Sequence, residues 1–528
     1  MFHKNIKGGD QNIAIDSIKP SRQRLNLLLI LLLICLPLQT LMAWQEGFYK
    51  DIFMDGGVEL YSKTSLPAIS SAGLSMEFLA TEDQTLQDSL LISNAEDSNG
   101  ILLYPDNAPR FRLIYTNGGS ATGHGDSMGG VGREIIRNFV ANGGSYSGSC
   151  AGAFISSLSY QASGSYESYY QIWPGRTAMG NVLDTYTGHF IPQNSPLLAY
   201  YSFGGDDYIS HIYHTGGPYP RETLDFPSGT EILLRYDHPP SILHHKGSCW
   251  AFKAADSTGR IVVIGSHPEN SSTGEGLDLT KAIFYYALDG VGSPQIKGNL
   301  VNGEPRIMDQ TTEDHNPLFT RIGDKQYHHF KLPIPPGTGE LTLSLDGEEG
   351  FEFRIYANPG DFAFASNAAW AATTSGSDQE LTILDPDSGN WYVGVQCIST
   401  VSTTLHNWGY EYISGTEILN GATYTIQAAW TPAVVAVDER PQTHLLFSNF
   451  PNPFNGSTNF QIQIDQASDV TIDIFDNTGR HLEQLANTWK QAGTYRIHWQ
   501  PDALSSGIYL ARMSTLKGHQ TIRVLYLK

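Results

Sequence analysis

The sequence contains 528 residues, which is too long for one hydrophobic core and predicts about three domains. Its 32 basic and 53 acidic residues give a formal net charge of −21. Such an acidic chain argues against nucleic acid and against an anionic membrane surface as partners. The 53 glycines and 27 prolines, beside 40% hydrophobic residues, are typical of a turn-rich globular protein rather than of a disordered one.

The N-terminus has the features of a secretory signal. Arg22 and Arg24 precede an apolar run over residues 25–38, and Ala43 supplies a small residue at a cleavage position. We therefore expect residues 1–43 to be removed on export, which would leave no stable membrane span. An uncleaved membrane anchor is the alternative, although the apolar run is short for a full span.

Three cysteines lie beyond this signal, namely Cys150, Cys249 and Cys397. Their odd number and the absence of a close pair argue against a disulfide framework. A free thiol in an exported protein needs a reason, and catalysis is one. Cys249 precedes a tryptophan and is expected to lie in the core.

Residues 44–295 are predicted to form an α/β domain, because strand-like and helix-like segments alternate along them. Successive strands separated by helices imply a parallel sheet with crossovers, and sites in such sheets gather at the carboxyl ends of the strands. Gly118, Gly119 and Cys150 fall at that edge. The expected strands are 52–54, 75–80 and 112–116, and the expected helices are 65–74 and 132–142.

The segment 144–154 is the motif around which this domain is organised. A run suited to a buried strand ends at Gly148, and a helix-compatible run begins at about Ala151. Gly148 and Gly152 flank Cys150 at two residues on either side, which is the spacing of a nucleophile elbow. The N-terminus of the following helix would favour the thiolate. A buried structural cysteine in a glycine-rich turn is the alternative.

His267 and Glu269 supply the partners that a thiol nucleophile needs. They follow the apolar strand 261–265, and residues two apart point the same way in an extended chain. A thiol needs a base, and the base needs a carboxylate to orient it. We therefore predict a catalytic triad of Cys150, His267 and Glu269. Backbone N–H groups beside the thiol would stabilise an oxyanion, and those predicted are at Gly118, Gly119 and Ala151.

Neither a metal nor another cofactor is expected. The glycine-rich run 118–132 lacks the Gly-Lys-Ser/Thr motif of a phosphate-binding loop. Histidines such as His211 and His214 have no cysteine or carboxylate cluster at ligand spacing. The predicted chemistry therefore depends on protein side chains.

These motifs resemble the class I glutamine amidotransferase-like superfamily. The run 142–154 and the run 267–269 are most similar to the amidotransferase-like domain at the N-terminus of biotin–protein ligase. The resemblance implies a flavodoxin-like fold, a doubly wound parallel sheet, with a Cys-His-Glu triad. The segment 214–218 also resembles this family, which implies that Gly216 and Gly217 take part in oxyanion or substrate binding.

The chain departs from the family in two respects. Phe154 stands where glutaminases usually carry glutamine, which argues against glutamine as the substrate. No ligase or synthetase domain follows, so no acceptor for ammonia is evident. An amide or peptide is therefore the expected substrate.

In residues 320–432 the periodicity of the apolar residues changes, because short runs with alternating apolar residues replace the helical spacing. Leu341, Leu343 and Leu345 share one face of a strand, and turn clusters separate this run from similar ones. The pattern predicts an all-β sandwich. The span 323–430 resembles the bacterial pre-peptidase C-terminal domain, which implies an accessory of a secreted hydrolase; a structural spacer is the alternative.

Residues 444–528 are predicted to form a second all-β, Ig-like sandwich, with strands at 458–464, 470–475 and 495–499. The run 449–455, the turn 476–480 and the final strand from Ser506 resemble, in this order, the C-terminal sorting domain of the type IX secretion system. The resemblance implies the type IX machinery as a partner. It also implies export through the periplasm to the outer-membrane surface or the medium. A plain adhesion module is the alternative for this segment.

Two classes of function remain open on the sequence. The first is a secreted or cell-surface thiol-dependent hydrolase that cleaves an amide or peptide bond through the predicted triad. The second is a surface-displayed binding or adhesion protein with a non-catalytic amidotransferase-like domain. The three triad residues favour the first.

Overall fold

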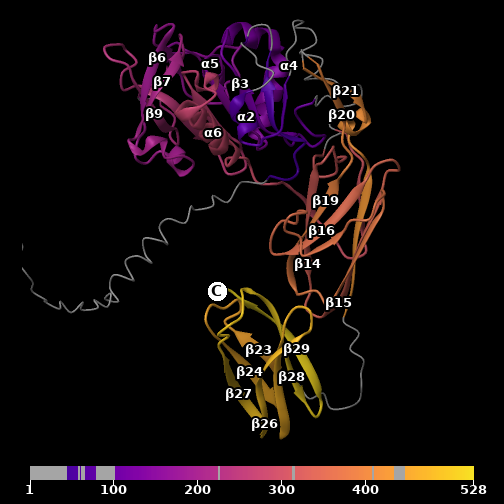
Figure 1. The fold of residues 1–528 in the computed structure, drawn as a ribbon. Coiled ribbons are helices and arrows are strands. Elements are labelled where there is room, and N and C mark those ends of the chain that lie inside the picture. Colours follow the sequence, from indigo (N-terminus) through magenta and orange to yellow (C-terminus); the bar gives the residue numbers. More distant parts are fainter. Residues whose placement is uncertain are drawn as a thin grey trace, which may run out of the picture. The chain divides into compact units, whose positions relative to one another are not determined.

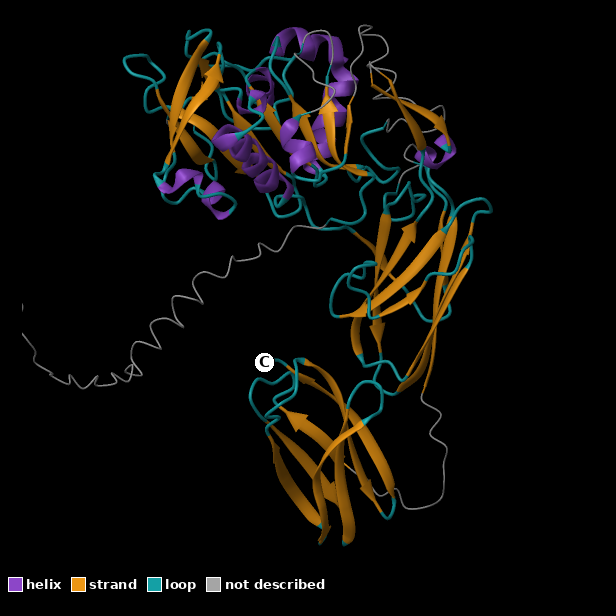
Figure 2. Cartoon of the chain, viewed as in Figure 1, coloured by secondary structure: helices purple, strands orange, loops and turns teal. Residues whose placement is uncertain are grey.

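The computed structural model describes residues 45–56, 60, 66–78, 101–223, 226–311, 316–406, 409–432 and 446–528. The predicted signal, residues 1–43, lies outside them. The chain divides into two compact units, residues 1–434 and 435–528. Strands make up 44% and helices 14% of the described residues. Figure 2 shows strands in both units, whereas the helices of the described residues all lie in the first.

A nine-stranded sheet carries the predicted site in the first unit (Figure 1). Its first five strands are parallel, and the last four continue the sheet in antiparallel fashion. The order across the sheet is β2 (Met76–Phe78), β1 (Lys50–Asp55), β3 (Phe111–Thr116), β4 (Ser145–Ser149), β11 (Arg260–Ile264), β10 (Gly247–Lys253), β9 (Glu231–Asp237), β6 (Thr185–Phe190) and β7 (Tyr208–His214).

The predicted fold class, a flavodoxin-like doubly wound parallel sheet, is wrong. Four of the nine strands are antiparallel to their neighbours, and strand outweighs helix in the described residues. The prediction extrapolated the alternation of strand and helix over residues 52–154 to the whole of 44–295. Between 177 and 264 the described residues instead form strands joined by turns and short 3₁₀ segments, without crossover α-helices.

Two of the predicted helices differ in extent from those observed. The helix expected at 65–74 is α2 (Pro67–Ser71), and the one expected at 132–142 is the second half of a longer helix, α4 (Ala121–Ala141). The Ser120 hydroxyl accepts a hydrogen bond from the Gly123 N–H at 3.1 Å, which caps this longer helix. A break at Gly129, with φ of 71°, separates its two halves.

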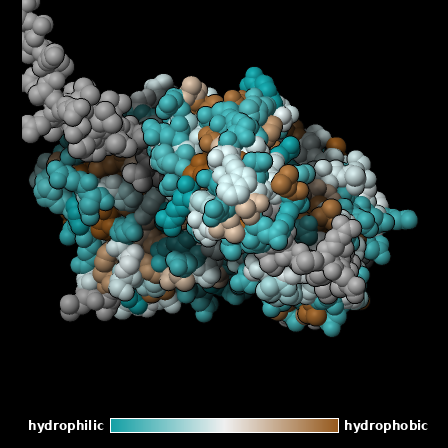
Figure 3. All heavy atoms as spheres, turned by 90° about the horizontal axis from the view of Figure 1, so that it is seen from below, coloured by the Kyte–Doolittle hydropathy of each residue, from teal (hydrophilic) through white to brown (hydrophobic). Residues whose placement is uncertain are grey.

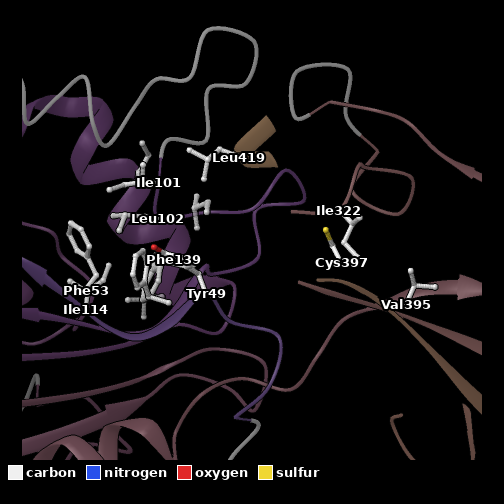
Figure 4. Close-up of a cluster of buried hydrophobic side chains, with 14 of the residues drawn as sticks. Tyr49, Phe53, Ile101, Leu102, Ile114, Phe139, Ile322, Val395, Cys397 and Leu419 are labelled. Carbon is white, nitrogen blue, oxygen red and sulfur yellow. The ribbon is translucent and has the colours of Figure 1, made fainter. Parts of the chain in front are cut away.

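Helices cover both faces of the parallel strands. Because successive side chains of a strand point to opposite faces, Leu113 and Tyr115 face α6 (Gly274–Leu288), where the Tyr115 and Phe284 rings lie 5.2 Å apart. Ile114 faces the other way and joins the core beneath α4 and α5 (Ala151–Ser156). Figure 4 shows Ile114 in that core with Phe53 and Phe139.

Two further sheets follow the nine-stranded sheet within the first unit. The predicted alternation is observed, since Leu341, Leu343 and Leu345 are all buried. One sheet has the order β12 (Ile296–Asn299), β14 (Tyr327–Ile334), β19 (Gly389–Cys397), β16 (Phe353–Pro359) and β17 (Trp370–Ala372). The other has the order β13 (Pro305–Met308), β22 (Tyr424–Pro432), β15 (Thr338–Gly347) and β18 (Gln379–Leu384). The smaller elements are the pairs β5 (Thr177–Met179) with β8 (Pro218–Pro220) and β20 (Ser402–His406) with β21 (Gly409–Ser414), and the 3₁₀ helices η1 (Pro196–Ala199), η2 (Phe203–Gly205), η3 (Pro268–Asn270) and η4 (Thr416–Asn420).

Buried polar contacts join these sheets to the nine-stranded sheet. Arg110 donates to both carboxylate oxygens of Asp324 at 2.8 and 2.9 Å, and the Tyr104 hydroxyl donates to the Asp324 carbonyl at 2.8 Å. Both charged side chains are 1% exposed. Such a pair is costly to break because either charge left alone would be buried and uncompensated. The parts predicted as 44–295 and 320–432 therefore fold as one compact unit.

The second unit consists of two antiparallel sheets around its own core. Phe447, Phe460 and Trp499 are buried there, and the predicted strands 458–464, 470–475 and 495–499 fall on β24, β25 and β27. One sheet has the order β23 (Leu446–Phe450), β24 (Thr458–Ile464) and β27 (Gly493–Trp499). The other has the order β26 (His481–Lys490), β25 (Ser468–Phe475), β28 (Gly507–Thr515) and β29 (Gly518–Tyr526).

The predicted turn 476–480 joins β25 to β26. Hydrogen bonds from the Thr478 hydroxyl and the Arg480 N–H lower the pKa of Asp476 to about 2.

The molecular face in Figure 3 is mostly hydrophilic, with hydrophobic residues in scattered patches. This surface is consistent with the acidic composition of the chain.

Candidate active site

Cys150 lies in the turn between β4 and α5, at the carboxyl edge of the parallel strands. Its backbone has φ of 50° and ψ of −103°, a conformation that residues with a side chain rarely adopt. Its N–H donates to the Ile264 carbonyl at 2.9 Å, which fixes the turn to the end of β11. Backbone strain of this kind costs on the order of 1–3 kcal/mol and clusters at functional sites. The predicted nucleophile therefore occupies a strained strand-to-helix turn.

The two glycines beside Cys150 are required by the close packing of the turn. A Cβ atom on Gly148 would lie 2.7 Å from the carbonyl carbon of Gly152. A Cβ on Gly152 would lie 2.2 Å from the carbonyl oxygen of Thr116 on β3. Neither position has room for a side chain, so the glycine spacing has a steric cause.

His267 and Glu269 meet in the short turn that follows β11. Nδ1 of His267 lies 2.8 Å from Oε1 of Glu269, and both side chains are buried. The contact does not arise from extended chain, as the sequence suggested, but from η3, which begins at Pro268 and turns the carboxylate toward the ring. The N–H of His267 donates to the Tyr213 carbonyl at 2.8 Å and holds the turn against β7.

The electrostatics of His267 favour its protonated form. Burial lowers the pKa of His267, but interactions with the Cys150 sulfur and the Glu269 carboxylate outweigh burial and raise that pKa to about 10. Among the described residues, Nε2 of His267 is buried without a hydrogen-bond partner of normal geometry. The ring is therefore suited to hold a proton beside Cys150.

Gly118 forms a wall shared by the thiol and the imidazole. A Cβ atom on Gly118 would lie 2.4 Å from Cε1 of His267 and 3.5 Å from Cβ of Cys150. Its N–H donates to Oδ1 of Asn117 at 2.7 Å. Gly118 therefore lies close to both reactive side chains. Its N–H, which was predicted to stabilise an oxyanion, instead donates to Asn117.

Gly216 and Gly217 belong to the segment 213–218, which passes over the Cys150 thiol. The Cys150 thiol donates to the Thr215 carbonyl at 3.7 Å. A Cβ on Gly217 would lie 1.7 Å from the Gly265 carbonyl oxygen, so the segment passes in direct contact with the end of β11. The Gly216 N–H donates to the Val182 carbonyl at 2.7 Å and is engaged there rather than at the thiol.

The two remaining predicted oxyanion donors differ in position. Gly119 forms an isolated bridge with Leu60. Ala151 is the first residue of α5 and directly follows the thiol. The N–H groups of the first helical turn have no partner within the helix, so Ala151 is the better placed donor for an oxyanion.

Two residues that the sequence analysis did not select support the predicted base. The Ser149 hydroxyl donates to Oε1 of Glu269 at 2.8 Å, the same oxygen that contacts His267. The Tyr115 hydroxyl lies 3.1 Å from the Ser149 hydroxyl. The position of Ser149 directly before the thiol was the sequence signal that could have identified it, whereas Tyr115 has none.

Two other buried histidines lie in polar clusters close to this edge. Nδ1 of His214 is 3.1 Å from the Ser266 hydroxyl, and burial, aided by the nearby His267, lowers the pKa of His214 to about 4. Nε2 of His124 contacts Asp55 at 3.0 Å. Within the described ranges no group of three or more His, Cys, Asp or Glu residues is arranged to hold a metal.

The other two thiols contrast with Cys150. Cys249 and Cys397 are both free and buried, and burial raises the pKa of each well above its usual value. Figure 4 shows Cys397 beside Ile322 in the hydrophobic core. Within the described residues, neither thiol has an electrostatic interaction with a histidine like that between Cys150 and His267. The three cysteines therefore provide internal controls for one another.

Residues 448–526 match the family described as "Secretion system C-terminal sorting domain". The second unit is a type IX secretion C-terminal sorting domain. The protein is therefore exported through the periplasm and is secreted or held at the outer-membrane surface, with the type IX machinery as a partner. No helix in the described part of the chain is long and apolar enough to span a bilayer. The resemblances of the first unit to amidotransferase-like and pre-peptidase domains stay predictions.

Other comparisons give only distant likenesses. No curated protein matches the chain. Dimeric latent PorU from Porphyromonas gingivalis is similar at 13% identity with a TM-score of 0.16, over 48% of this chain and 37% of that one. PorZ, a surface component of the type IX secretion system of the same organism, is similar at 13% identity with a TM-score of 0.12, over 30% and 29%. A GH2 β-galacturonidase from Eisenbergiella tayi is similar at 9% identity with a TM-score of 0.12, over 38% and 35%. The chain thus spans well under half of the length of each.

Proposed function

We propose that the first unit is a thiol-dependent hydrolase that cleaves an amide or peptide bond outside the cell. Cys150 is the nucleophile, His267 the general acid and base, and Glu269 the group that orients the ring. One observation carries the proposal. A strained turn presents the Cys150 thiol beside His267, whose other nitrogen contacts a buried carboxylate at 2.8 Å.

The first half of the reaction follows from these positions. The Cys150 thiolate attacks the amide carbonyl carbon, a C–S bond forms, and the carbonyl oxygen becomes an oxyanion near the Ala151 N–H. The C–N bond then breaks as the His267 imidazolium gives its proton to the leaving amine. The products of this half are a free amine and an acyl thioester on Cys150, with His267 neutral.

Water completes the cycle. Neutral His267 takes a proton from a water molecule, whose oxygen attacks the thioester carbonyl. The C–S bond breaks, a carboxylic acid leaves, and the thiolate and imidazolium are restored. Glu269 holds the ring in the required orientation throughout, because its contact is with Nδ1 and leaves Nε2 for the reacting groups.

A binding protein without turnover is the second candidate, and one observation favours it. Cys150 is only 8% exposed, and its thiol donates to the Thr215 carbonyl, which lies where a substrate would approach. In a non-catalytic protein this contact would simply satisfy a buried thiol. A hydrolase would require the segment at Thr215 to move aside when substrate binds.

Mutagenesis separates the two candidates. We expect the mature protein to release primary amines from a peptide mixture, and Cys150→Ala and His267→Ala each to remove most of this activity. Because these groups act as a unit, the double variant should be little worse than either single one. Glu269→Gln should cost less, since a neutral amide still orients the ring.

Cys249→Ala is the matched control, because it removes a buried thiol that has no histidine partner. It should retain activity. Full activity in His267→Ala combined with loss in Cys150→Ala would place the base elsewhere, and His214 or His124 would be examined next. Absence of amine release from every peptide, together with unchanged binding in Cys150→Ala, would favour the binding protein.

A further inference from the structure

Three large apolar side chains are exposed around the segment that crosses the thiol. Leu183 is 66% exposed, Tyr186 is 62% exposed and Met179 is 45% exposed. Single exposed apolar residues are common on protein surfaces, but neighbouring ones mark interaction sites. Together with half-buried Tyr213 they are here called the apolar rim.

Each member of the apolar rim lies next to residues 213–218, through strand pairing or through direct contact. Tyr186 on β6 pairs with Tyr213 on β7, and their rings lie 5.8 Å apart. Met179 on β5 pairs with Pro218 on β8. A Cβ atom on Gly216 would lie 3.4 Å from Cδ2 of Leu183, so this leucine packs against the glycine.

The same segment contacts both reactive side chains. The Thr215 carbonyl lies 3.7 Å from the Cys150 sulfur. The Tyr213 ring lies 5.8 Å from the His267 ring. The apolar rim therefore begins at the catalytic pair and extends outward from it along β6 and β7.

We infer that the amide cleaved here carries a bulky apolar side chain, such as that of phenylalanine or leucine, next to the scissile carbonyl. The inference rests on the proposed hydrolase function and specifies its substrate class. Rim side chains that are exposed in the free protein would lose contact with water on binding such a group, which is favourable. The polar side chain of glutamine would gain little from the rim, because its amide would lose contact with water without a hydrogen-bond partner there.

Chloromethyl ketones test this specificity without knowledge of the natural substrate. In the labelling reaction the Cys150 sulfur attacks the methylene carbon, a C–S bond forms, the C–Cl bond breaks and chloride leaves. N-acetyl chloromethyl ketones built on phenylalanine, alanine and glutamine present the same reactive group with different side chains. The readout is the ratio of the phenylalanine rate to the alanine rate, measured by mass spectrometry of the Cys150 peptide.

We expect this ratio to be roughly tenfold or more in the wild-type protein, because apolar pockets discriminate side chains to about that extent. The glutamine reagent should react about as slowly as the alanine one. Leu183→Ala combined with Tyr186→Ala should bring the ratio close to one. Leu384→Ala is the matched control, since it truncates a leucine that is 70% exposed on β18, and it should leave the ratio unchanged.

Labelling by iodoacetamide, which carries no side chain, separates this inference from the proposed function. Equal rates for the phenylalanine and alanine reagents, with rapid iodoacetamide labelling of Cys150, would overturn the substrate class and leave the hydrolase intact. A ratio that persists in the double variant would overturn the role of the rim. Slow iodoacetamide labelling of Cys150, no faster than that of Cys249, would overturn the proposed function itself.

Discussion

Substitution of Gly118 by alanine tests the arrangement of the candidate site at a position that has no reactive group. The added methyl group would lie 2.4 Å from Cε1 of His267, whereas ordinary van der Waals contact begins at 3.4 Å. The imidazole must therefore move by about 1 Å from its present position beside Cys150. A displacement of that size at a reacting group costs on the order of 10²-fold in rate, or about 2.7 kcal/mol in activation free energy.

The assay is alkylation of Cys150 by the phenylalanine chloromethyl ketone at neutral pH, followed by mass spectrometry. Gly130→Ala is the matched control, because no atom lies within 4 Å of the position where its Cβ would be. We expect Gly118→Ala to react about 10²-fold more slowly than wild type and Gly130→Ala to react at the wild-type rate. Thermal unfolding of each variant checks that the fold persists. A folded Gly118→Ala protein with an unchanged rate would refute the assignment of His267 as the partner of Cys150.

Three other perturbations have defined outcomes. Ser149→Ala removes a hydrogen bond to the Glu269 carboxylate worth about 1.5–3 kcal/mol. It should therefore slow peptide hydrolysis roughly tenfold or more, and the pH dependence of the rate should be displaced from that of wild type. Burial lowers the pKa of His267, but its partners raise it to about 10 from 6.5, so the protonated ring stabilises the fold fully below pH 6.5 and this contribution is lost as the pH rises through 10. The difference in melting temperature between wild type and His267→Gln should accordingly be largest near pH 6 and shrink by pH 10.5; a difference that grows with pH would contradict the sign. Asp324→Asn leaves a buried guanidinium unpaired and should lower the free energy of unfolding by roughly 3–5 kcal/mol, measured by denaturant titration, and a loss below 1 kcal/mol would show that the pair is not needed.

The elbow was predictable from sequence because its constraints are local. Two glycines must flank the thiol where the backbone of Gly152 passes Thr116, and this requirement is visible as a spacing of residues. The contact between His267 and Glu269 was also predictable, since a two-residue separation keeps them close in either an extended chain or a 3₁₀ turn. Their partner Ser149 was not selected, although it directly precedes the thiol, because it is one of several serines in that run.

The first half of α4 was hidden for a different reason. Glycines lower helix propensity, so the glycine-rich run 118–132 was interpreted as a loop and the helix was expected to begin only at residue 132. The structure shows why glycine is present there, since a Cβ on Gly125 would lie 1.7 Å from the Ser168 carbonyl oxygen. Close approach of another segment, which sequence does not reveal, outweighs propensity at this position.

Strand β6, in the antiparallel part of the nine-stranded sheet, was missed because its inward residues are polar. His189 on β6 is fully buried, with Nδ1 2.8 Å from the Ser248 hydroxyl and Nε2 3.1 Å from the Thr187 hydroxyl. Burial lowers the pKa of His189 to about 3, so the ring packs as a neutral group. A strand whose inward residues are threonine and histidine lacks the apolar alternation that predicts a strand. In the sorting domain, the predicted strands 458–464, 470–475 and 495–499, whose inward residues are apolar, fall on β24, β25 and β27, whereas β23, β26 and β29 were not predicted.

The most direct test of the central claim is a comparison of the three thiols in one sample. The mature protein is treated with iodoacetamide at pH 7, and the rates at Cys150, Cys249 and Cys397 are followed by peptide mass spectrometry. If Cys150 is a thiolate paired with His267, it should be alkylated much faster than the other two, and His267→Ala should remove the difference. Equal, slow labelling of all three cysteines in the folded protein would show that Cys150 is a structural cysteine and would contradict the proposed hydrolase.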